Sequence, residues 1–151
     1  MQKTIISDAS CLILLDKIGH IDILKKLFGE IVTTNEVSQE FARPLPEWIK
    51  LQEPVDKNYQ TIIEASLDKG EASAIALAVE QDDCLLIIDH MKGRQFAMQL
   101  RLNITGTLGV IVNAKLSGIL NSVKPILEQI KQTNFRMSER VQQEILQKAG
   151  E

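Results

Sequence analysis

The chain has 151 residues, of which 44% are hydrophobic and 25% are charged, with a formal net charge of −3. We expect a single domain over residues 1–151, because this length and composition are typical of one globular domain with its own core. The mild acidity excludes the strongly basic surface typical of non-enzymatic nucleic-acid binders, but not a nuclease, whose catalytic acids count toward the total.

In chain order, the apolar pattern predicts strands that alternate with helices. The strands are expected at residues 4–7, 31–32, 84–88 and 102–105, with an irregular or edge segment at 48–54. The helices are expected to begin near residues 9, 21, 33, 56, 71, 90, 106, 122 and 138. This alternation predicts an α/β fold in which a mainly parallel central sheet is flanked by helices on both faces.

Local signals place several of the helix starts. Thr33 stands at capping-box spacing from the acid three residues later, so a helix should begin there. The Lys69-Gly70 pair is expected to break one helix, and the next helix should start at Glu71. Ser122 is the expected cap of the last helix but one.

Two further features concern the compartment. Cys11 and Cys84 lie in apolar stretches and are interpreted as core thiols, and the sequence has no Cys/His cluster with zinc spacing. No apolar stretch approaches membrane-spanning length, and the N-terminal apolar run is too short for a signal peptide. A reducing cytoplasm and no membrane association fit these features.

Two aspartates directly follow the two most apolar strands. Asp8 ends the run over residues 4–7, and Asp89 ends the run over residues 84–88. Either one alone is more readily explained as a helix N-cap. Because parallel strands present their carboxyl ends at one edge of a sheet, the two side chains should meet there, where they repel each other unless a cation joins them. The placement suggests a hard metal site and phosphate chemistry.

Two glutamates extend this acidic set. Glu71 shares a helix face with Ile75 and Ala78, so this acid stands at the N-terminal tip of an inward stripe and could be a ligand that faces the crevice. Glu40 lies beside Phe41 at the border of an apolar face, and a solvated helix face explains it at least as well.

Polar residues near these acids each have a functional and an ordinary interpretation. Ser10 could simply be a small polar residue at the start of a helix, or its hydroxyl could hydrogen-bond the Asp8 carboxylate or a metal-bound water. The turn at Thr105 and Gly106 could receive a phosphate on free N–H groups or be an ordinary capped turn. Arg94 is either a surface charge or a partner of the phosphodiester, and His90 is weak support for a general base.

Together these residues resemble the PIN-domain family over nearly the whole chain. The matching pieces, in order, are Ile-Ile-Ser-Asp8-Ala-Ser10, Glu36-Val37-Ser-Gln-Glu40, Gly70-Glu71-Ala72-Ser-Ala74-Ile75-Ala-Leu77-Ala78, Leu-Leu-Ile-Ile-Asp89 and Thr105-Gly106-Thr107-Leu108-Gly109-Val110. The Gly-Glu-Ala helix and the Thr-Gly-Thr-Leu-Gly turn are similar to a bacterial and archaeal branch related to VapC-type toxin nucleases of toxin–antitoxin pairs. No single piece is diagnostic, but five in this order are fairly specific.

The resemblance implies a three-layer α/β/α fold and a metal-dependent nuclease that acts mostly on RNA. It implies that Mg²⁺ or Mn²⁺ is bound by a catalytic set of acids, namely Asp8, Glu40, Glu71 and Asp89. Ser10 would support the first of them, and Thr105 and Gly106 would lie close to the metal or the scissile phosphate. Relatives often carry a second acid after the last of these four, whereas this chain has His90, so we expect one strong and one weak metal site.

The principal hypothesis is hydrolysis of RNA phosphodiesters, with single-stranded or looped RNA favoured. Toxins of this kind are held inactive by an antitoxin protein, which would then be a partner. A homodimer is also expected, because the first helices carry more apolar residues than one small core should absorb, namely Leu12, Leu15, Ile18 and Leu24. The alternative is that all four are internal.

Two other functions stay open. A PIN-like module with a weakened site could bind RNA or a protein partner without cleavage, and His90 mildly favours this alternative. A phosphotransfer receiver or a haloacid-dehalogenase-type phosphatase ranks lower, because the acid pair or Asp-x-Asp that each needs is missing around Asp8. A dinucleotide-binding fold would need an early Gly-x-Gly-x-x-Gly, which the chain lacks.

Overall fold

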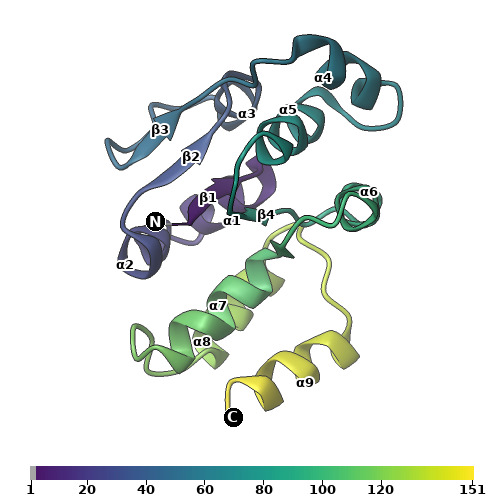
Figure 1. Ribbon diagram of the computed structural model, residues 1–151. Helices are drawn as coiled ribbons and strands as arrows, with labels where there is room; N and C mark the ends of the chain where they lie inside the picture. Colours follow the sequence, from purple (N-terminus) through teal and green to yellow (C-terminus); the bar gives the residue numbers. More distant parts are fainter. Residues whose placement is uncertain (1–2) are drawn as a thin grey trace.

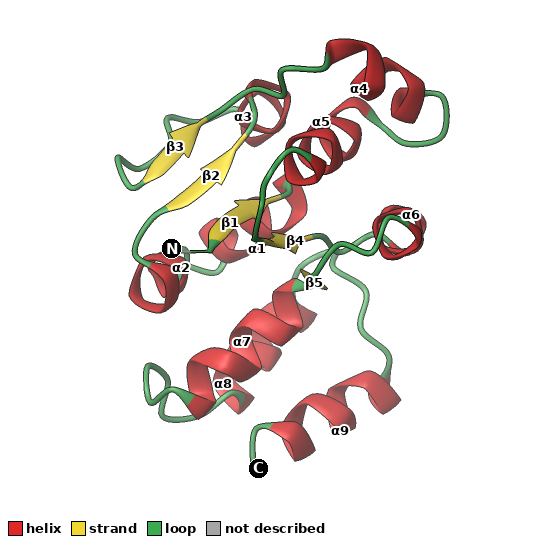
Figure 2. Cartoon of the chain, in the orientation of Figure 1, coloured by secondary structure: helices red, strands yellow, loops and turns green. Residues whose placement is uncertain are grey.

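Five short strands form one sheet in the computed structural model, which describes residues 3–151 (Figure 1, Figure 2). The strands are β1 (Thr4–Ser7), β2 (Ile31–Thr33), β3 (Ile49–Leu51), β4 (Cys84–Ile87) and β5 (Ile104–Thr105). Their order is β3-β2-β1-β4-β5, and every neighbouring pair is parallel. The predicted parallel central sheet is confirmed, and β3 is the edge strand expected within residues 48–54.

Nine helices flank the sheet within the described residues. The first five are α1 (Ala9–Lys17), α2 (Asp22–Phe28), α3 (Asn35–Phe41), α4 (Lys57–Glu64) and α5 (Lys69–Val79). The remaining four are α6 (Met91–Gln99), α7 (Thr107–Leu116), α8 (Lys124–Lys131) and α9 (Glu139–Lys148). None of these nine helices combines the length and hydrophobicity that crossing a bilayer requires.

The centre of the sheet is the pair of strands β1 and β4. They are paired in register up to their carboxyl ends, where Ser7 stands opposite Ile87. Asp8 follows β1 directly, and Asp89 comes two residues after the end of β4, so both aspartates leave the sheet at the same edge. Open parallel sheets bind their ligands at this edge.

Alternate residues of the central strands face two separate cores. Ile5 and Ile87 belong to a larger core with residues of α1, α2, α7 and α8. Ile6 and Leu86 belong to a smaller core with residues of α4, α5 and α6. Small side chains let α5 approach the sheet closely, and residues 70–78 of this helix are all buried. The burial of both faces confirms the predicted three-layer α/β/α fold.

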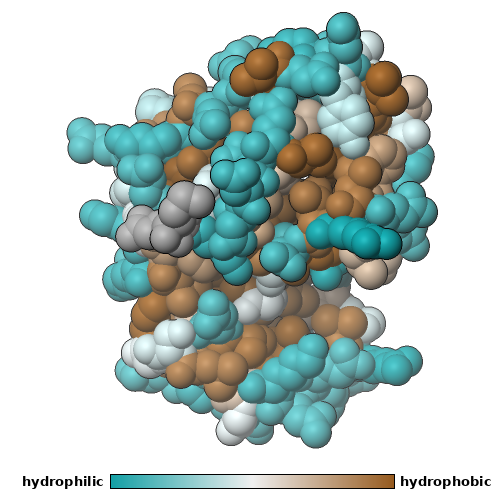
Figure 3. Space-filling model, viewed as in Figure 1, coloured by the Kyte–Doolittle hydropathy of each residue, from teal (hydrophilic) through white to brown (hydrophobic). Residues whose placement is uncertain are grey.

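The apolar residues that suggested a homodimer are all buried in the larger core: Leu12, Leu15, Ile18 and Leu24. They therefore give no support for a homodimer, and the alternative that they are internal is the correct one. Cys11 and Cys84 are free and buried, as predicted for core thiols. On the face seen in Figure 3, hydrophilic residues cover α9 and apolar residues gather over α7.

The start of α3 lies one residue later than predicted. Its cap is Thr34, whose hydroxyl oxygen accepts a hydrogen bond from the Val37 N–H at 3.2 Å. Thr33 instead ends β2, where it pairs with Leu51 in the sheet. The hydroxyl of Thr33 is not free to cap a helix, because it donates to the carbonyl of Ser7 at 2.8 Å.

The predicted starts of α5 and α8 are also wrong. The Lys69–Gly70 pair begins α5 instead of ending the helix before it. Asp68 makes this possible by accepting the Glu71 N–H at 2.8 Å, which caps the helix two residues earlier than expected. Before α8, Ser122 makes no cap, because its hydroxyl donates to the Glu151 carboxylate at 2.7 Å.

A buried chain of hydrogen bonds ties α3 to α5. The Ser73 hydroxyl on α5 donates to the carbonyl of Gly70 at 2.7 Å and lies 2.6 Å from the Thr34 hydroxyl at the start of α3. Both hydroxyl-bearing residues are fully buried. This chain fixes the relative position of the two helices that carry Glu40 and Glu71.

We expect Ser73→Ala to lower the free energy of unfolding by about 1–2 kcal/mol, because it removes two hydrogen bonds from a site that water does not reach. Urea denaturation measures this loss. Ser66→Ala, at an exposed serine shortly before α5, is the matched control and should change the free energy by less than about 0.5 kcal/mol. Equal losses in the two variants would contradict the role given to Ser73.

Candidate metal centre

Asp8 is a buried carboxylate with two backbone donors. The residue is only 2% exposed and caps α1. Its Oδ1 accepts a hydrogen bond from the Cys11 N–H at 3.0 Å, and its Oδ2 accepts one from the Asp89 N–H at 3.0 Å. The second bond crosses from the end of β1 to the end of β4 and joins the two aspartates predicted to meet at this edge.

Asp89 holds the beginning of α7. Its Oδ1 accepts the Thr107 N–H at 2.7 Å, and its Oδ2 accepts the Thr107 hydroxyl at 2.6 Å. Gly106 lies so close that a Cβ added there would come within 2.9 Å of Asp89 Oδ1 and 3.0 Å of Arg94 Nη1. The turn expected to offer free N–H groups to a phosphate therefore gives the N–H of Thr107 to a carboxylate of the protein itself.

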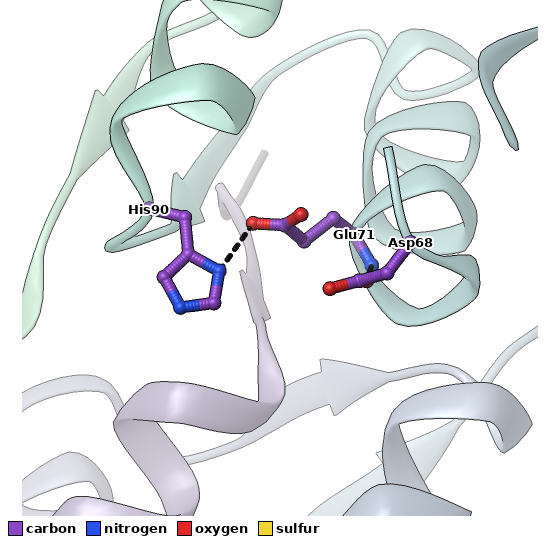
Figure 4. A group of neighbouring side chains, drawn as sticks. All are labelled: Asp68, Glu71 and His90. Atoms are coloured by element: carbon purple, nitrogen blue, oxygen red, sulfur yellow. Dashed lines mark hydrogen bonds and ion pairs between the residues drawn. The ribbon is translucent and has the colours of Figure 1, made fainter. Parts of the chain in front are cut away.

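A second group of ligand atoms lies at the start of α5 (Figure 4). Nδ1 of His90 lies 2.9 Å from Oε2 of Glu71, and Asp68 caps the turn that carries Glu71. One ligand atom from each of these three residues lies within 4.8 Å of the others. Among residues 3–151 this is the single set of three acid, cysteine or histidine side chains as close as this.

Glu40 reaches the same region from α3. It is an exposed residue, but a Cβ added to Gly70 would overlap its carboxylate, so the Glu40 side chain lies over the first turn of α5. Gly93 plays a similar part on α6, since a Cβ there would come within 3.0 Å of Glu71 Oε2. Two glycines thus let carboxylates approach the helix backbones closely.

The pKa values of these acids show that their charges act on one another. Burial raises the pKa of Asp8 well above its ordinary value, and the neighbouring Asp89 carboxylate raises it further, followed by Glu71. Burial is also the first cause of the raised pKa of Glu71 and of the raised pKa of Glu40, and Asp68 is the second cause in both cases. The His90 imidazole acts in the opposite direction on both glutamates.

The arrangement fits a divalent cation. Within the described part of the chain, none of these carboxylates forms an ion pair with a lysine or arginine, and Glu71 pairs only with His90. Concentrated carboxylates that no lysine or arginine pairs with are the chemistry of a divalent-cation site. Five carboxylates and one imidazole supply mainly oxygen ligands, which hard divalent cations prefer.

The predicted residues divide into two groups. The Asp8 carboxylate accepts the N–H of Asp89 at the end of β4, whereas Glu40 and Glu71 gather on the other side with His90. The raising of the Asp8 pKa by Glu71 places the two groups within electrostatic reach of each other.

Sequence reasoning missed Asp68. The signal was present, because Asp68 stands three residues before Glu71, which is the spacing of a capping box. The Lys69-Gly70 pair hides this signal, because the pattern predicts a helix break there. A glycine in the first turn in fact leaves room for the carboxylate of Glu40.

The remaining predicted residues surround the two groups. Ser10 is half-buried and lines a hollow together with His90, and within residues 3–151 its hydroxyl makes no hydrogen bond to a carboxylate. Nη1 of Arg94 donates to the Ile88 carbonyl at 2.9 Å, which holds the guanidinium beside Asp89. The Thr105 hydroxyl is directed toward Gly109 and not into the acidic cluster.

Comparison with known proteins identifies one family. A family model described as PIN domain matches residues 4–151 and thus takes in every strand and helix of the fold. No curated protein and no solved structure shows significant similarity to the chain.

The raised pKa values predict the pH dependence of the metal-free protein. A carboxyl whose pKa is higher in the folded state binds more protons there than in the unfolded chain, so its contribution to stability is present at low pH and is lost as pH rises through the folded pKa. We therefore expect Asp8, Glu40 and Glu71 to make the free energy of unfolding fall as the pH rises above about 4, the ordinary pKa of these carboxyls. Urea denaturation in a chelating buffer measures the slope.

Asp8→Asn should flatten this slope, because the largest of the upward shifts disappears with the carboxylate. Glu128→Gln, on the exposed surface of α8, is the control and should leave the slope as it is. Glu151 does not interfere, since hydrogen bonds from Ser122 and Val123 lower its pKa to about 2 and it stays charged throughout this range. A free energy that rises with pH in the wild type would contradict the prediction.

Proposed function

The chain belongs to the PIN-domain family, and we propose that it is a metal-dependent nuclease that hydrolyses phosphodiester bonds in RNA. PIN domains are generally metal-dependent nucleases. The observation that carries the proposal for this chain is the gathering of carboxylates from α1, α3, α5 and the end of β4 at one edge of the sheet, with no lysine or arginine paired to them among residues 3–151.

We propose that four acids bind the cation, namely Asp8, Glu40, Glu71 and Asp89. Asp68 and His90 lie close enough to contribute further ligand atoms. Each carboxylate oxygen has two lone pairs. The oxygens of Asp8 and Asp89 that accept one hydrogen bond therefore keep a second lone pair for a metal. A bound Mg²⁺ or Mn²⁺ would neutralise the charge that builds on phosphate oxygens and would make water a better nucleophile.

The residues around the acids support the binding of a phosphodiester. Arg94 is held beside Asp89 by its bond to the Ile88 carbonyl and still has donors free for a phosphate. Gly106 exposes backbone next to Asp89, and a side chain at this position would fill the space. These features place positive charge and open backbone on the Asp89 side of the site.

An alternative function, binding of RNA or a protein partner without cleavage, is favoured by a specific observation. Asp8 and Asp89 both have structural tasks, since they cap α1 and hold the start of α7. A chain that had lost catalysis would still keep these two acids for its fold. Calorimetric titration with Mn²⁺ separates the two functions, because a module without a metal site would bind no ion.

We extend the proposal to the toxin of a toxin–antitoxin pair, on the resemblance to that branch of the family alone. Single-stranded or looped RNA as substrate and an antitoxin protein as partner belong to the same extension. The homodimer stays a prediction without support from the first helices.

We expect Asp8→Asn and Asp89→Asn each to reduce Mn²⁺-dependent RNA cleavage by at least about 100-fold, because an amide replaces a charged ligand at the centre of the site. A quenched fluorescent RNA oligonucleotide measures the rate. Asp82→Asn is the matched control, since Asp82 is exposed in the turn before β4, at the opposite edge of the sheet. Cleavage that persists in both active-site variants would reject the site, and a loss in all three would point to damaged folding.

The replacement of His90 tests the part of the site that Asp68, Glu71 and His90 form. We expect His90→Asp to increase the affinity for Mn²⁺ on the order of tenfold, because a further carboxylate would stand beside Asp68 and Glu71. In a chelating buffer the same variant should melt at a lower temperature than the wild type, because a like charge replaces the hydrogen-bond partner of Glu71.

Calorimetry and thermal melting measure these two opposite effects. His20→Asp, at a histidine that contacts Gln129 far from the acids, is the control for affinity and should leave it unchanged. An unchanged affinity in His90→Asp would show that this side chain lies outside the reach of the ion.

A further inference from the structure

Two hollows lie on either side of one aromatic residue next to the acids. The smaller hollow, of about 240 Å³, is lined by Ser10, His90 and Phe135 among others. The larger groove, of about 730 Å³, runs from Asp89 to α9 and is lined by Phe135 as well. Phe135 belongs to the connection between α8 and α9, drawn in yellow in Figure 1, which passes the N-terminal end of α7.

Phe135 is held in a fixed position although it is half-exposed. One side of the residue packs against the larger core. Its N–H donates to the Thr133 hydroxyl oxygen at 3.1 Å, and that hydroxyl donates to the Ile130 carbonyl at 2.6 Å. The connection is therefore ordered by its own hydrogen bonds, and Phe135 lines two hollows, one that reaches His90 and one that reaches Asp89.

The cations around Phe135 are not neutralised by acids of the protein. Lys17 lines the smaller hollow, and Arg94, Arg136 and Lys148 line the groove. None of the four forms an ion pair within residues 3–151. The two acids that line the groove do not neutralise these cations, because Glu144 pairs with Arg140 and Asp89 belongs to the acidic site. Unpaired cations on both sides of an aromatic ring match the phosphates and bases of a nucleic-acid strand.

We propose that Phe135 stacks on an unpaired base of the substrate next to the scissile phosphate, while Arg136 and Lys148 bind phosphates of the same strand along the groove. This inference rests on the proposed nuclease function and specifies its substrate as a single strand. In a duplex the bases stack on one another and cannot reach the ring, whereas every unpaired base has a face for it. The ordered ring binds without a large loss of side-chain entropy.

The experiment measures binding of a short single-stranded RNA that contains one 2-aminopurine, in the presence of a chelator so that no cleavage takes place. Phe135→Leu keeps an apolar anchor for the connection but removes the aromatic face, so we expect the dissociation constant to rise on the order of tenfold. Phe135→Trp should retain binding. Stacking should quench the fluorescence of 2-aminopurine in the wild type and in Phe135→Trp, but not in Phe135→Leu.

A matched pair of arginines tests the path of the backbone. Arg136→Ala should weaken binding and reduce the salt dependence of the dissociation constant by about one counterion. Arg101→Ala, at an exposed arginine that precedes β5 at the opposite edge of the sheet and lines neither hollow, is the control and should leave binding unchanged. Duplex RNA should bind less tightly and should not respond to Phe135→Leu.

Equal affinities of the wild type and Phe135→Leu for the single strand, or equal quenching in both, would overturn the proposal and leave the groove to a protein partner. Absence of RNA binding in the wild type would overturn it too. Cleavage with Mn²⁺ is assayed separately, so a failure of the nuclease function is distinguished from a failure of stacking. A protein that binds RNA through Phe135 but never cleaves it would refute only the nuclease function.

Discussion

The hydrogen bond from the Asp89 N–H to the Asp8 carboxylate is the interaction on which the rest of the site depends. It joins residues 81 positions apart, at the ends of the two central strands. A carboxylate that is only 2% exposed is costly without donors, and Asp8 has two of them from the backbone. Because Asp89 in turn holds Thr107, the chain leaving β1, the chain leaving β4 and the start of α7 are tied into one unit.

The two sides of the acidic cluster differ in rigidity. On one side Asp8 and Asp89 are fixed by backbone groups, and their geometry is set before any ligand arrives. On the other side Glu40 is exposed and the His90 side chain is 63% exposed, so these groups can adjust. Glu71 stands between the two, buried but hydrogen-bonded to His90. A cation would thus meet one preorganised half and one adaptable half.

The sequence predicts most of the fold because buried parallel strands are continuous apolar runs, and the residue after such a run stands at the ligand edge. Asp8 and Asp89 could be located in this way. Helix starts are not fixed by the sequence pattern, because neighbouring residues compete for the cap: Thr33 is retained by the sheet and Thr34 caps in its place. Phe135 could not be found, since its significance comes from the hollows on either side of it, lined by α1 and by α6, α7 and α9.

The position of Glu40 distinguishes two explanations of the acids, a functional cluster and a set of helix caps that lie near one another. Asp8, Asp68 and Asp89 all hold backbone N–H groups, so the fold alone accounts for them. Glu40 has no such task, because among the described residues it caps no helix and forms no ion pair. Repulsion from Asp68 should direct an exposed, flexible carboxylate into solvent, yet the Glu40 side chain lies over Gly70, on the side of the cluster. A cation shared with Glu71 would reverse the sign of that interaction, so Glu40 is the acid of this cluster whose position the fold alone explains least.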